Sequence, residues 1–273
     1  MLIRALAENT SVSETYGCEH GLSLYIEIDL HKILFDMGRK KLFLENAKKM
    51  GINLSDVDIA FVSHGHFDHG GGLRAFLGVN EIATVYVNRK AFDGHRSVKP
   101  NGIEDIGLER SLYCTHRFVM VGDELKIDEE LELFSDIKTS ESMCRSQKSL
   151  TVESSEGFVP DTFEHEQNLI ITQGARTALI TGCAHRGIVN ILKRYIERKG
   201  SAPDLVVGGF HLSNPDTGEG EDPALIDEIA AYLSALPTKY YTCHCTGLAS
   251  YQLLKERMGD QIEYLSTGGM IEF

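Results

Sequence analysis

Apolar and polar residues alternate along the first third of the chain in runs that predict strands and helices. A polar turn at Leu30-His31 separates two apolar runs and predicts a hairpin. Gly51 is a typical stop for a stretch with helical spacing. The strands are expected at 1–7, 22–29, 32–38, 58–66 and 83–88, and the helices at 41–51 and 72–79.

The second half of the chain repeats this rhythm. Strands are expected at 117–123, 131–137, 148–154, 168–174, 176–185, 204–212, 239–247 and 262–273, and helices at 187–200, 223–236 and 248–258. The runs at 168–174 and 176–185 are close enough to form a hairpin. Strands followed by helices in each half predict an α/β fold in which two sheets pack together with helices outside.

One segment has no clear periodicity. Residues 89–112 mix charged residues with proline and glycine, and long irregular segments in compact domains are often functional. We therefore predict a lid or excursion over 89–112 within a single domain that covers 1–273. No linker rich in proline, serine or glycine divides the chain.

The composition narrows the classes of partner. The chain has 273 residues and a net charge of −13, from 40 acidic and 27 basic residues. Such a surface repels a phosphate backbone, so a nucleic-acid partner is not expected. No run of about 18 apolar residues predicts a membrane span, and the N-terminus has no signal-peptide pattern. Six cysteines without a CxxC pair predict reduced thiols in a cytoplasmic protein.

The stretch SHGHFDHGGG at 63–72 holds three histidines and an aspartate within six positions. His64 and His66 lie two apart at the end of the expected strand, so their side chains point to the same side. Asp68 and His69 follow where the chain must turn, and they suit a second ion beside the first. The glycines permit unusual backbone angles and close approach. This stretch predicts a metal site built on a strand end.

Further ligands for two ions must come from other strand ends. Cys183 and His185 lie two apart at the end of an apolar run, and His244 and His211 end two others. His165 lies between Glu164 and Glu166, which is equally compatible with a solvated surface histidine. The cysteines are also compatible with small buried hydrophobic residues. The remaining histidines belong to no cluster and are expected at the surface or in loops: His20, His31, His95 and His116.

HGHFDH matches the HxHxDH motif and resembles the signature of the metallo-β-lactamase superfamily. KILFDMG at 32–38 and IAFVSHGHFDHGGGL follow in the order that this family shows. HGLSLYIE, LITGCAHRGIVN and CHCTG resemble a narrower branch, that of dihydropterin-ribofuranosylaminobenzene phosphate synthase-like proteins. The resemblance covers about residues 20–250. It implies an αββα four-layer sandwich with a metal site at one edge.

The resemblance also implies roles for individual residues. A histidine before a strand, an acidic residue at its end and a last histidine complete the shell in most members. That pattern would take His165, Cys183 and His244, whereas the GCxH motif of the branch favours His185 over His165 as the third histidine. We therefore predict His64, His66, Asp68, His69, His185 and His244 as ligands. Asp36, Cys183 and His165 are predicted to support them, Asp36 by a hydrogen bond to the ligand loop.

This shell suits two divalent ions, with Zn²⁺ expected first and Mn²⁺ or Fe²⁺ also compatible. Two ions generate a bridging hydroxide near neutral pH and stabilise the charge that develops on a carbonyl or phosphoryl oxygen. Asp68 is the predicted catalytic residue, both as ligand and as proton acceptor. The expected function is a metal-dependent hydrolase, and the alternative is a non-catalytic or regulatory metal-binding protein of the same fold.

Several features suit an anionic substrate. Thr246 and Gly247 precede an expected helix, whose first N–H groups favour anions. Arg186 lies beside His185, and a glycine pair precedes His211. These four residues (Arg186, His211, Thr246 and Gly247) are the predicted substrate contacts, and the substrate is expected to be a small phosphorylated or carboxylated molecule.

Overall fold

The computed structural model describes residues 1–141, 144–215 and 217–273. The chain divides into two compact units. Unit 1 comprises 1–122, 149–167 and 266–273, and unit 2 comprises 123–148 and 168–265. The single domain over 1–273 stays a prediction. Among the described residues, no helix combines the length and apolar character needed to cross a membrane.

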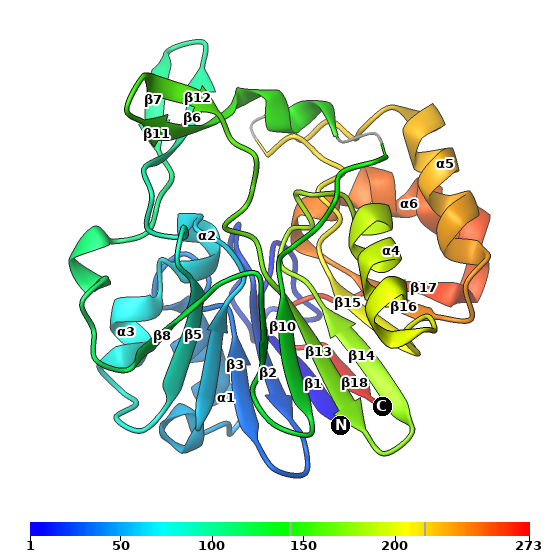
Figure 1. The fold of residues 1–273 in the computed structure, drawn as a ribbon. Helices are drawn as coiled ribbons and strands as arrows, with labels where there is room; N and C mark the ends of the chain where they lie inside the picture. The colour runs from blue at the N-terminus through cyan, green and yellow to red at the C-terminus, as the bar shows by residue number, and fades with distance from the viewer. Residues whose placement is uncertain (142–143, 216) are drawn as a thin grey trace. The chain divides into compact units, whose positions relative to one another are not determined.

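Unit 1 contains a seven-stranded mixed sheet (Figure 1). Its order is β18 (Met270–Glu272), β1 (Leu2–Ala7), β2 (Ser23–Glu27), β3 (Lys32–Phe35), β4 (Ile59–Val62), β5 (Thr84–Asn88) and β8 (Phe118–Val121). From β18 to β3 neighbouring strands are antiparallel, and from β3 to β8 they are parallel. The parallel strands therefore deliver their carboxyl ends to one edge, where ligand-binding loops commonly lie.

The helices of unit 1 pack on one face of this sheet. They are α1 (Leu42–Lys49), the short α2 (Phe67–Gly70) and α3 (Leu73–Leu77). Phe43 of α1 and Phe76 of α3 share one buried cluster with Leu34, Val62 and Val85 of the sheet. Strand residues of the opposite parity, such as Ile33 and Phe61, are buried as well. Apolar residues on both sides of the strands are typical of a covered parallel sheet.

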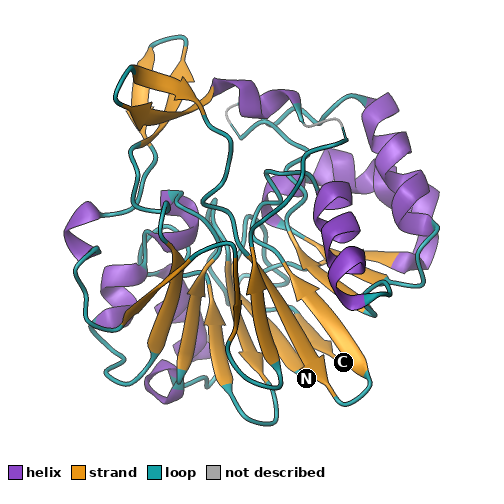
Figure 2. Cartoon of the chain, in the orientation of Figure 1, coloured by secondary structure: helices purple, strands orange, loops and turns teal. Residues whose placement is uncertain are grey.

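The segment 89–112, predicted as an irregular excursion, contains two strands. β6 (His95–Lys99) and β7 (Gly102–Asp105) form a hairpin, and η2 (Arg110–Leu112) follows. β6 also pairs with β11 (Leu150–Ser154), which pairs with β12 (Gly157–Pro160), so that a four-stranded sheet forms. Figure 2 shows this small sheet standing apart from the large sheet of the same unit. Whether it acts as a lid stays a prediction.

Unit 2 is a second seven-stranded mixed sheet with three helices. The sheet order is β17 (Ile262–Tyr264), β16 (Lys239–Thr242), β15 (Leu205–Gly208), β14 (Arg176–Ile180), β13 (Asn168–Gln173), β10 (Leu131–Phe134) and β9 (Glu124–Lys126). β14, β15, β16 and β17 are parallel neighbours, and β13 and β14 form the predicted hairpin. The carboxyl ends of β14, β15 and β16 therefore lie at one edge.

The helices of unit 2 are α4 (Ile188–Lys199), α5 (Pro223–Ser234) and α6 (Leu248–Met258). Their apolar residues form one buried cluster with the sheet, in which Tyr195, Leu233 and Leu254 contact the face that carries Val206 and Tyr240. Gly200 ends α4 in the left-handed conformation with φ of 77°, as its position after the periodic run predicts. All three predicted helices of this half are confirmed.

The last predicted strand is wrong in its extent. Residues 262–273 were expected as one edge strand, but they form β17 in unit 2 and β18 in unit 1. Residues 265–269 separate the two strands, and Gly268 has φ of 86°, a value that favours glycine. A turn at Thr267 to Gly269 therefore breaks the run. The short strands β9 and β12 were not expected either.

Candidate functional site

The predicted ligand loop of unit 1 leaves the carboxyl end of β4. The strand ends at Val62, His66 is the N-cap of α2, and the loop between them is buried. His64 and His69 are fully buried, and His66 and Asp68 are 5% and 8% exposed. The rings of His64 and His69 are 4.1 Å apart between centroids, and those of His64 and His66 are 4.6 Å apart. The four predicted side chains of this loop therefore come together within one unit.

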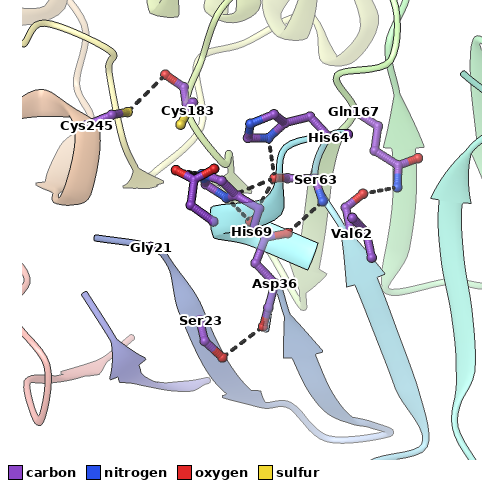
Figure 3. A network of polar contacts seen from close by, with 12 residues as sticks. Gly21, Ser23, Asp36, Val62, Ser63, His64, His69, Gln167, Cys183 and Cys245 are labelled. Carbon is purple, nitrogen blue, oxygen red and sulfur yellow. Dashed lines mark hydrogen bonds and ion pairs between the residues drawn. The ribbon is translucent and has the colours of Figure 1, made fainter. Parts of the chain in front are cut away.

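A buried carboxylate orients two of these histidines. Asp36 Oδ1 accepts a hydrogen bond from the Ser63 backbone N–H at 2.7 Å, and Asp36 Oδ2 accepts one from His69 Nδ1 at 2.6 Å. The Ser63 hydroxyl donates to Asp36 Oδ2 at 2.7 Å and lies 2.8 Å from His64 Nδ1 (Figure 3). Asp36 is fully buried with φ of 60°, an uncommon backbone conformation for a residue with a side chain. The hydrogen bond predicted for Asp36 is present.

These contacts select the tautomers of His64 and His69. Since Asp36 can only accept and the Ser63 hydroxyl donates to it, both histidines donate through Nδ1. The lone pair of each neutral ring is then on Nε2. His69 Nε2 lies 3.8 Å from Asp68 Oδ2, so an imidazole and a carboxylate present their ligand atoms toward each other. Metal-binding histidines commonly have such a carboxylate or hydroxyl behind the ligand ring.

Asp68 has a second histidine neighbour that was not expected. His20 Nε2 lies 3.2 Å from Asp68 Oδ2, and the His20 side chain is 35% exposed. The backbone oxygen of Asp68 also accepts from the Leu22 N–H at 3.1 Å. The expectation that His20 belongs to no cluster is therefore wrong. The sequence gives little indication of this contact, because His20 and Asp68 are 48 positions apart.

The glycines of the loop are required by close approach rather than by unusual angles. Gly65 and Gly71 have no positive φ. A Cβ added to Gly65 would overlap Ala91 O and the His95 ring, and one added to Gly71 would overlap Arg39 O and Phe67 O. The sequence suggested two roles for these glycines, unusual backbone angles and close approach of the chain, and close approach is the one that Gly65 and Gly71 have.

A second cluster of unit 1 contains His95, which was expected at the surface or in a loop, and His165. His95 is 1% exposed, so the expectation of a surface position is wrong for it. His165 is 2% exposed, which excludes the surface alternative that its acidic neighbours had left open. His66, His95, Asp161 and His165 place four ligand-type atoms within 4.8 Å of one another. Asp161 Oδ2 accepts from His95 Nδ1 at 2.9 Å and lies 3.2 Å from His165 Nε2. His95 lies in the hairpin that the sequence pattern did not predict, so this cluster could not be anticipated.

The His165 side chain binds the backbone of the ligand loop. His165 Nδ1 accepts a hydrogen bond from the Gly65 N–H at 2.9 Å, so the neutral ring donates to Asp161 through Nε2. Burial and the neighbouring His95 lower the pKa of His165. Burial and His165 hold the pKa of His66 well below its ordinary value. Burial raises the pKa of Asp161, but hydrogen bonds from His165 and His95 outweigh burial and lower it.

In unit 2, three loops carry the remaining predicted residues. The loop after β14 holds Cys183 and His185, the loop after β15 holds His211, and the loop after β16 holds His244. Among their described residues, each loop has one non-glycine residue with positive φ: Ala184 (54°), His211 (49°) and His244 (52°). Residues in this conformation cost free energy and cluster at functional sites. The rings of His185 and His211 are 4.3 Å apart between centroids, and both residues are buried.

The other predicted substrate contacts have structural partners in unit 2. The Thr246 hydroxyl is fully buried, accepts from the Phe210 N–H at 2.8 Å and lies 2.5 Å from the Thr242 hydroxyl. Arg186 Nη2 donates to Ile137 O. The Gly247 N–H donates to His244 O at 3.2 Å. A role of these residues in substrate binding stays a prediction.

A sequence profile of the Metallo-beta-lactamase superfamily matches residues 16–195. This match spans more than half of the chain and includes the whole loop from His64 to His69. The chain belongs to the metallo-β-lactamase superfamily. The predicted α/β class and metallo-β-lactamase fold are confirmed.

Relatives in this superfamily align over nearly the entire chain. A 7,8-dihydropterin-6-methyl-4-(β-D-ribofuranosyl)-aminobenzene-5′-phosphate synthase of Methanocaldococcus jannaschii is 27% identical over 287 residues, covering 99% of this chain and 96% of that protein. The crystal structure of Tm1679, described as a metal-dependent hydrolase of the β-lactamase superfamily, is 29% identical with a TM-score of 0.83. It covers 100% of this chain and 99% of its own. Zn²⁺-bound PqqB from Methylobacterium extorquens (11% identity, TM-score 0.56, full coverage of both chains) shares the fold.

Members of the metallo-β-lactamase superfamily bind divalent ions, and the donors of the unit 1 loop fit such ions. Three imidazoles and a carboxylate are a ligand set that Zn²⁺, Mn²⁺ and Fe²⁺ accept. The fit rests on orientation: Asp36 and Ser63 engage Nδ1 of His69 and His64, which leaves the lone pairs on Nε2. The lowered pKa of His66 keeps that ring neutral, as a ligand must be.

Proposed function

We propose that this protein is a metal-dependent hydrolase with a dinuclear site that acts on a small phosphorylated or carboxylated metabolite. The observation that supports it most directly is the buried loop of unit 1, where Asp36 and Ser63 orient His64 and His69. A loop that serves only as a connection gains nothing from four buried ionisable groups, because burial of each costs free energy.

In this proposal His64, His66, Asp68 and His69 hold the ions. The sequence adds His185 and His244 of unit 2 as the remaining ligands. Zn²⁺ is the first choice, and Mn²⁺ or Fe²⁺ would fit the same donors. Bound divalent ions would lower the pKa of a water molecule and polarise a carbonyl or phosphoryl oxygen of the substrate.

Asp68 has the contacts of a proton acceptor. Its Oδ2 lies 3.2 Å from His20 Nε2, and His20 is partly exposed. A proton accepted by Asp68 from the attacking water can therefore pass to a histidine that reaches solvent. His69 on the other side of Asp68 is fully buried and hydrogen-bonded to Asp36, so it keeps its orientation during this transfer.

The substrate class rests on charge and on one relative. The 27% identical relative is a 5′-phosphate synthase by name, which supports a phosphorylated substrate. A net charge of −13 argues against a polynucleotide. The same name favours a second candidate, synthase chemistry on a phosphorylated aminobenzene, and a regulatory metal-binding role is the non-catalytic alternative.

Metal analysis and a substrate panel test the proposal together. The purified chain should hold up to two divalent ions and hydrolyse phosphodiesters, phosphomonoesters or lactones in a reaction that a chelator stops. His64→Ala/His66→Ala should lower the metal content and abolish turnover, while His116→Ala, an exposed histidine, should change neither. An unchanged metal content in the double variant would refute the metal assignment. Full metal content without turnover on any hydrolase substrate would favour the synthase or the regulatory protein.

A further inference from the structure

Asp161 is a carboxylate of unit 1 that the proposed hydrolase chemistry does not use. Its side chain is 3% exposed and lies directly after β12. Asp161 Oδ1 accepts from the Phe163 N–H at 2.7 Å. Asp161 Oδ2 accepts from His95 Nδ1 at 2.9 Å and from His165 Nε2 at 3.2 Å. A buried carboxylate costs free energy unless donors compensate its charge, so these three donors hold Asp161 in one position.

The two histidines bound by Asp161 lie against each other and against the metal-ligand loop. The rings of His95 and His165 are 4.0 Å apart between centroids. A Cβ added to Gly65 would lie 2.6 Å from His95 Nε2, so the His95 ring packs directly on the loop. His95 is the first residue of β6 and Asp161 follows β12. The small sheet therefore supplies both groups.

His165 connects Asp161 to the backbone of the loop. Its Nε2–H donates to Asp161, because a carboxylate can only accept. The lone pair of the neutral ring is then on Nδ1, which accepts from the Gly65 N–H at 2.9 Å. In the other tautomer, Nδ1–H and the Gly65 N–H would be two donors that face each other. Asp161 therefore selects the tautomer of His165 that can bind the loop.

Gly65 separates two predicted ligands, His64 and His66. A shift of its peptide moves both imidazoles, and ligand geometry must be held within a fraction of an ångström for tight binding. Asp36 and Ser63 act on the ring of His64, whereas His165 acts on the backbone between the two rings. Because both ring nitrogens of His165 are engaged, this side chain suits a supporting role rather than that of a ligand.

We propose that Asp161 is a positioning residue for the metal site. This inference rests on the proposed function and deepens it. Through His165, Asp161 fixes the peptide between His64 and His66, and His95 of the small sheet holds Asp161 in place. Groups that support metal ligands from behind commonly contribute about 10- to 100-fold to metal affinity. Since Asp161 acts through another residue, its loss should change metal affinity and ligand geometry more than turnover at saturating metal.

Zn²⁺ affinity of Asp161→Asn tests this role. The amide has one acceptor oxygen for three N–H donors, so at least one donor faces its NH2 group. We expect the affinity, measured by competition with a chromogenic chelator, to fall by about 10-fold. The ligand-field spectrum of the Co²⁺-loaded chain should shift, which a loss of stability alone would not cause. Asp93→Asn, an exposed aspartate two residues before His95, is the control and should change neither.

Two substitutions at His165 separate the hydrogen bond from packing. His165→Ala removes the acceptor of the Gly65 N–H, so Zn²⁺ affinity should fall by about 10-fold, although the ions still bind at saturation. His165→Asn places an amide oxygen near the position of Nδ1 and should restore most of the affinity. An affinity that His165→Asn does not restore, or one that is unchanged in Asp161→Asn, would overturn the proposal.

Nuclear magnetic resonance of the metal-free chain tests the contacts without any ion. In the wild type the ¹⁵N shifts of the His165 ring should show a protonated Nε2 and an unprotonated Nδ1, and the opposite tautomer would overturn the proposal even if a variant fails to fold. A wild-type chain that binds no divalent ion would overturn the metal assignment and this role together. A wild type that binds ions no more tightly than Asp161→Asn would overturn this role alone.

Discussion

The two units carry their metal-competent side chains in opposite ways. Unit 1 places His64, His66, Asp68 and His69 in one loop of six residues after a single strand. Unit 2 distributes Cys183, His211 and Cys245 over three loops after three strands. The first arrangement is braced by one buried carboxylate, Asp36, whereas the second relies on left-handed residues at Ala184, His211 and His244. A contiguous motif can be oriented by one partner, but a dispersed cluster needs each loop shaped separately.

The largest effect should separate His185 of unit 2 from His165 of unit 1. We expect His185→Ala to remove at least one metal ion and abolish activity, because it deletes a predicted ligand. His165→Ala should keep both ions and much of the rate, because both of its ring nitrogens are engaged, by Gly65 N–H and by Asp161. Measurements of bound metal and turnover in both variants decide whether His185 or His165 is the third histidine ligand. The opposite result would assign the third histidine to His165.

Asp68→Asn should have the next largest effect. We expect kcat to fall by about 10²-fold or more, since the variant loses both a ligand and a proton acceptor. The melting temperature should change little, because asparagine keeps the shape of the side chain. Asp29→Asn, an exposed aspartate of unit 1, is the control. Activity within a few-fold of the wild type would make Asp68 a structural residue only.

Asp36→Asn tests whether one partner orients the contiguous loop. Both oxygens of Asp36 accept hydrogen bonds, from the Ser63 N–H at Oδ1 and from His69 and the Ser63 hydroxyl at Oδ2. The amide of Asp36→Asn has one acceptor oxygen, so its NH2 group would face a donor on one side. We expect metal affinity to fall by about 10- to 100-fold, the usual effect of a group that supports a ligand. The exposed Asp29→Asn should leave metal affinity unchanged. An unchanged affinity in Asp36→Asn would show that Asp36 does not orient the ligands.

Acid should destabilise the metal-free chain through unit 1. The pKa values of His66 and His165 are lowered in the folded state, so below about pH 6.5 the unfolded chain binds more protons than the folded one. The free energy of unfolding should therefore fall as the pH drops through 6.5, by at most about 1.4 kcal/mol per pH unit for each histidine. Denaturant unfolding of wild type and His165→Gln measures this, and the variant should show the shallower slope. Equal slopes would exclude His165 as a source.

The sequence predicted most elements and one half of the candidate site. Helices α1 and α4 were predicted because their apolar spacing and the glycines that follow them agree with the packing. The metal-ligand loop from His64 to His69 could be predicted because its residues are close together in the sequence. The β6–β7 hairpin was not, since all four residues of β7 are exposed and carry no alternation. His95 and Asp161 are separated by 66 positions in the sequence, and the small sheet brings them together. No local sequence pattern therefore predicts their contact.

The pairing of β1 with β18 has a consequence for how the chain folds. Leu2 lies opposite Glu272, and the Met1 amine donates to Phe273 O at 2.7 Å. The loop closed by this pair spans residues 2–272, so its entropic cost is among the largest that the sheet meets. During synthesis β1 is made before the other strands of this sheet, and its outer edge stays uncovered until β18 has been made. Until then the strand is an open template for pairing with other chains, and loss of residues 270–273 should promote aggregation.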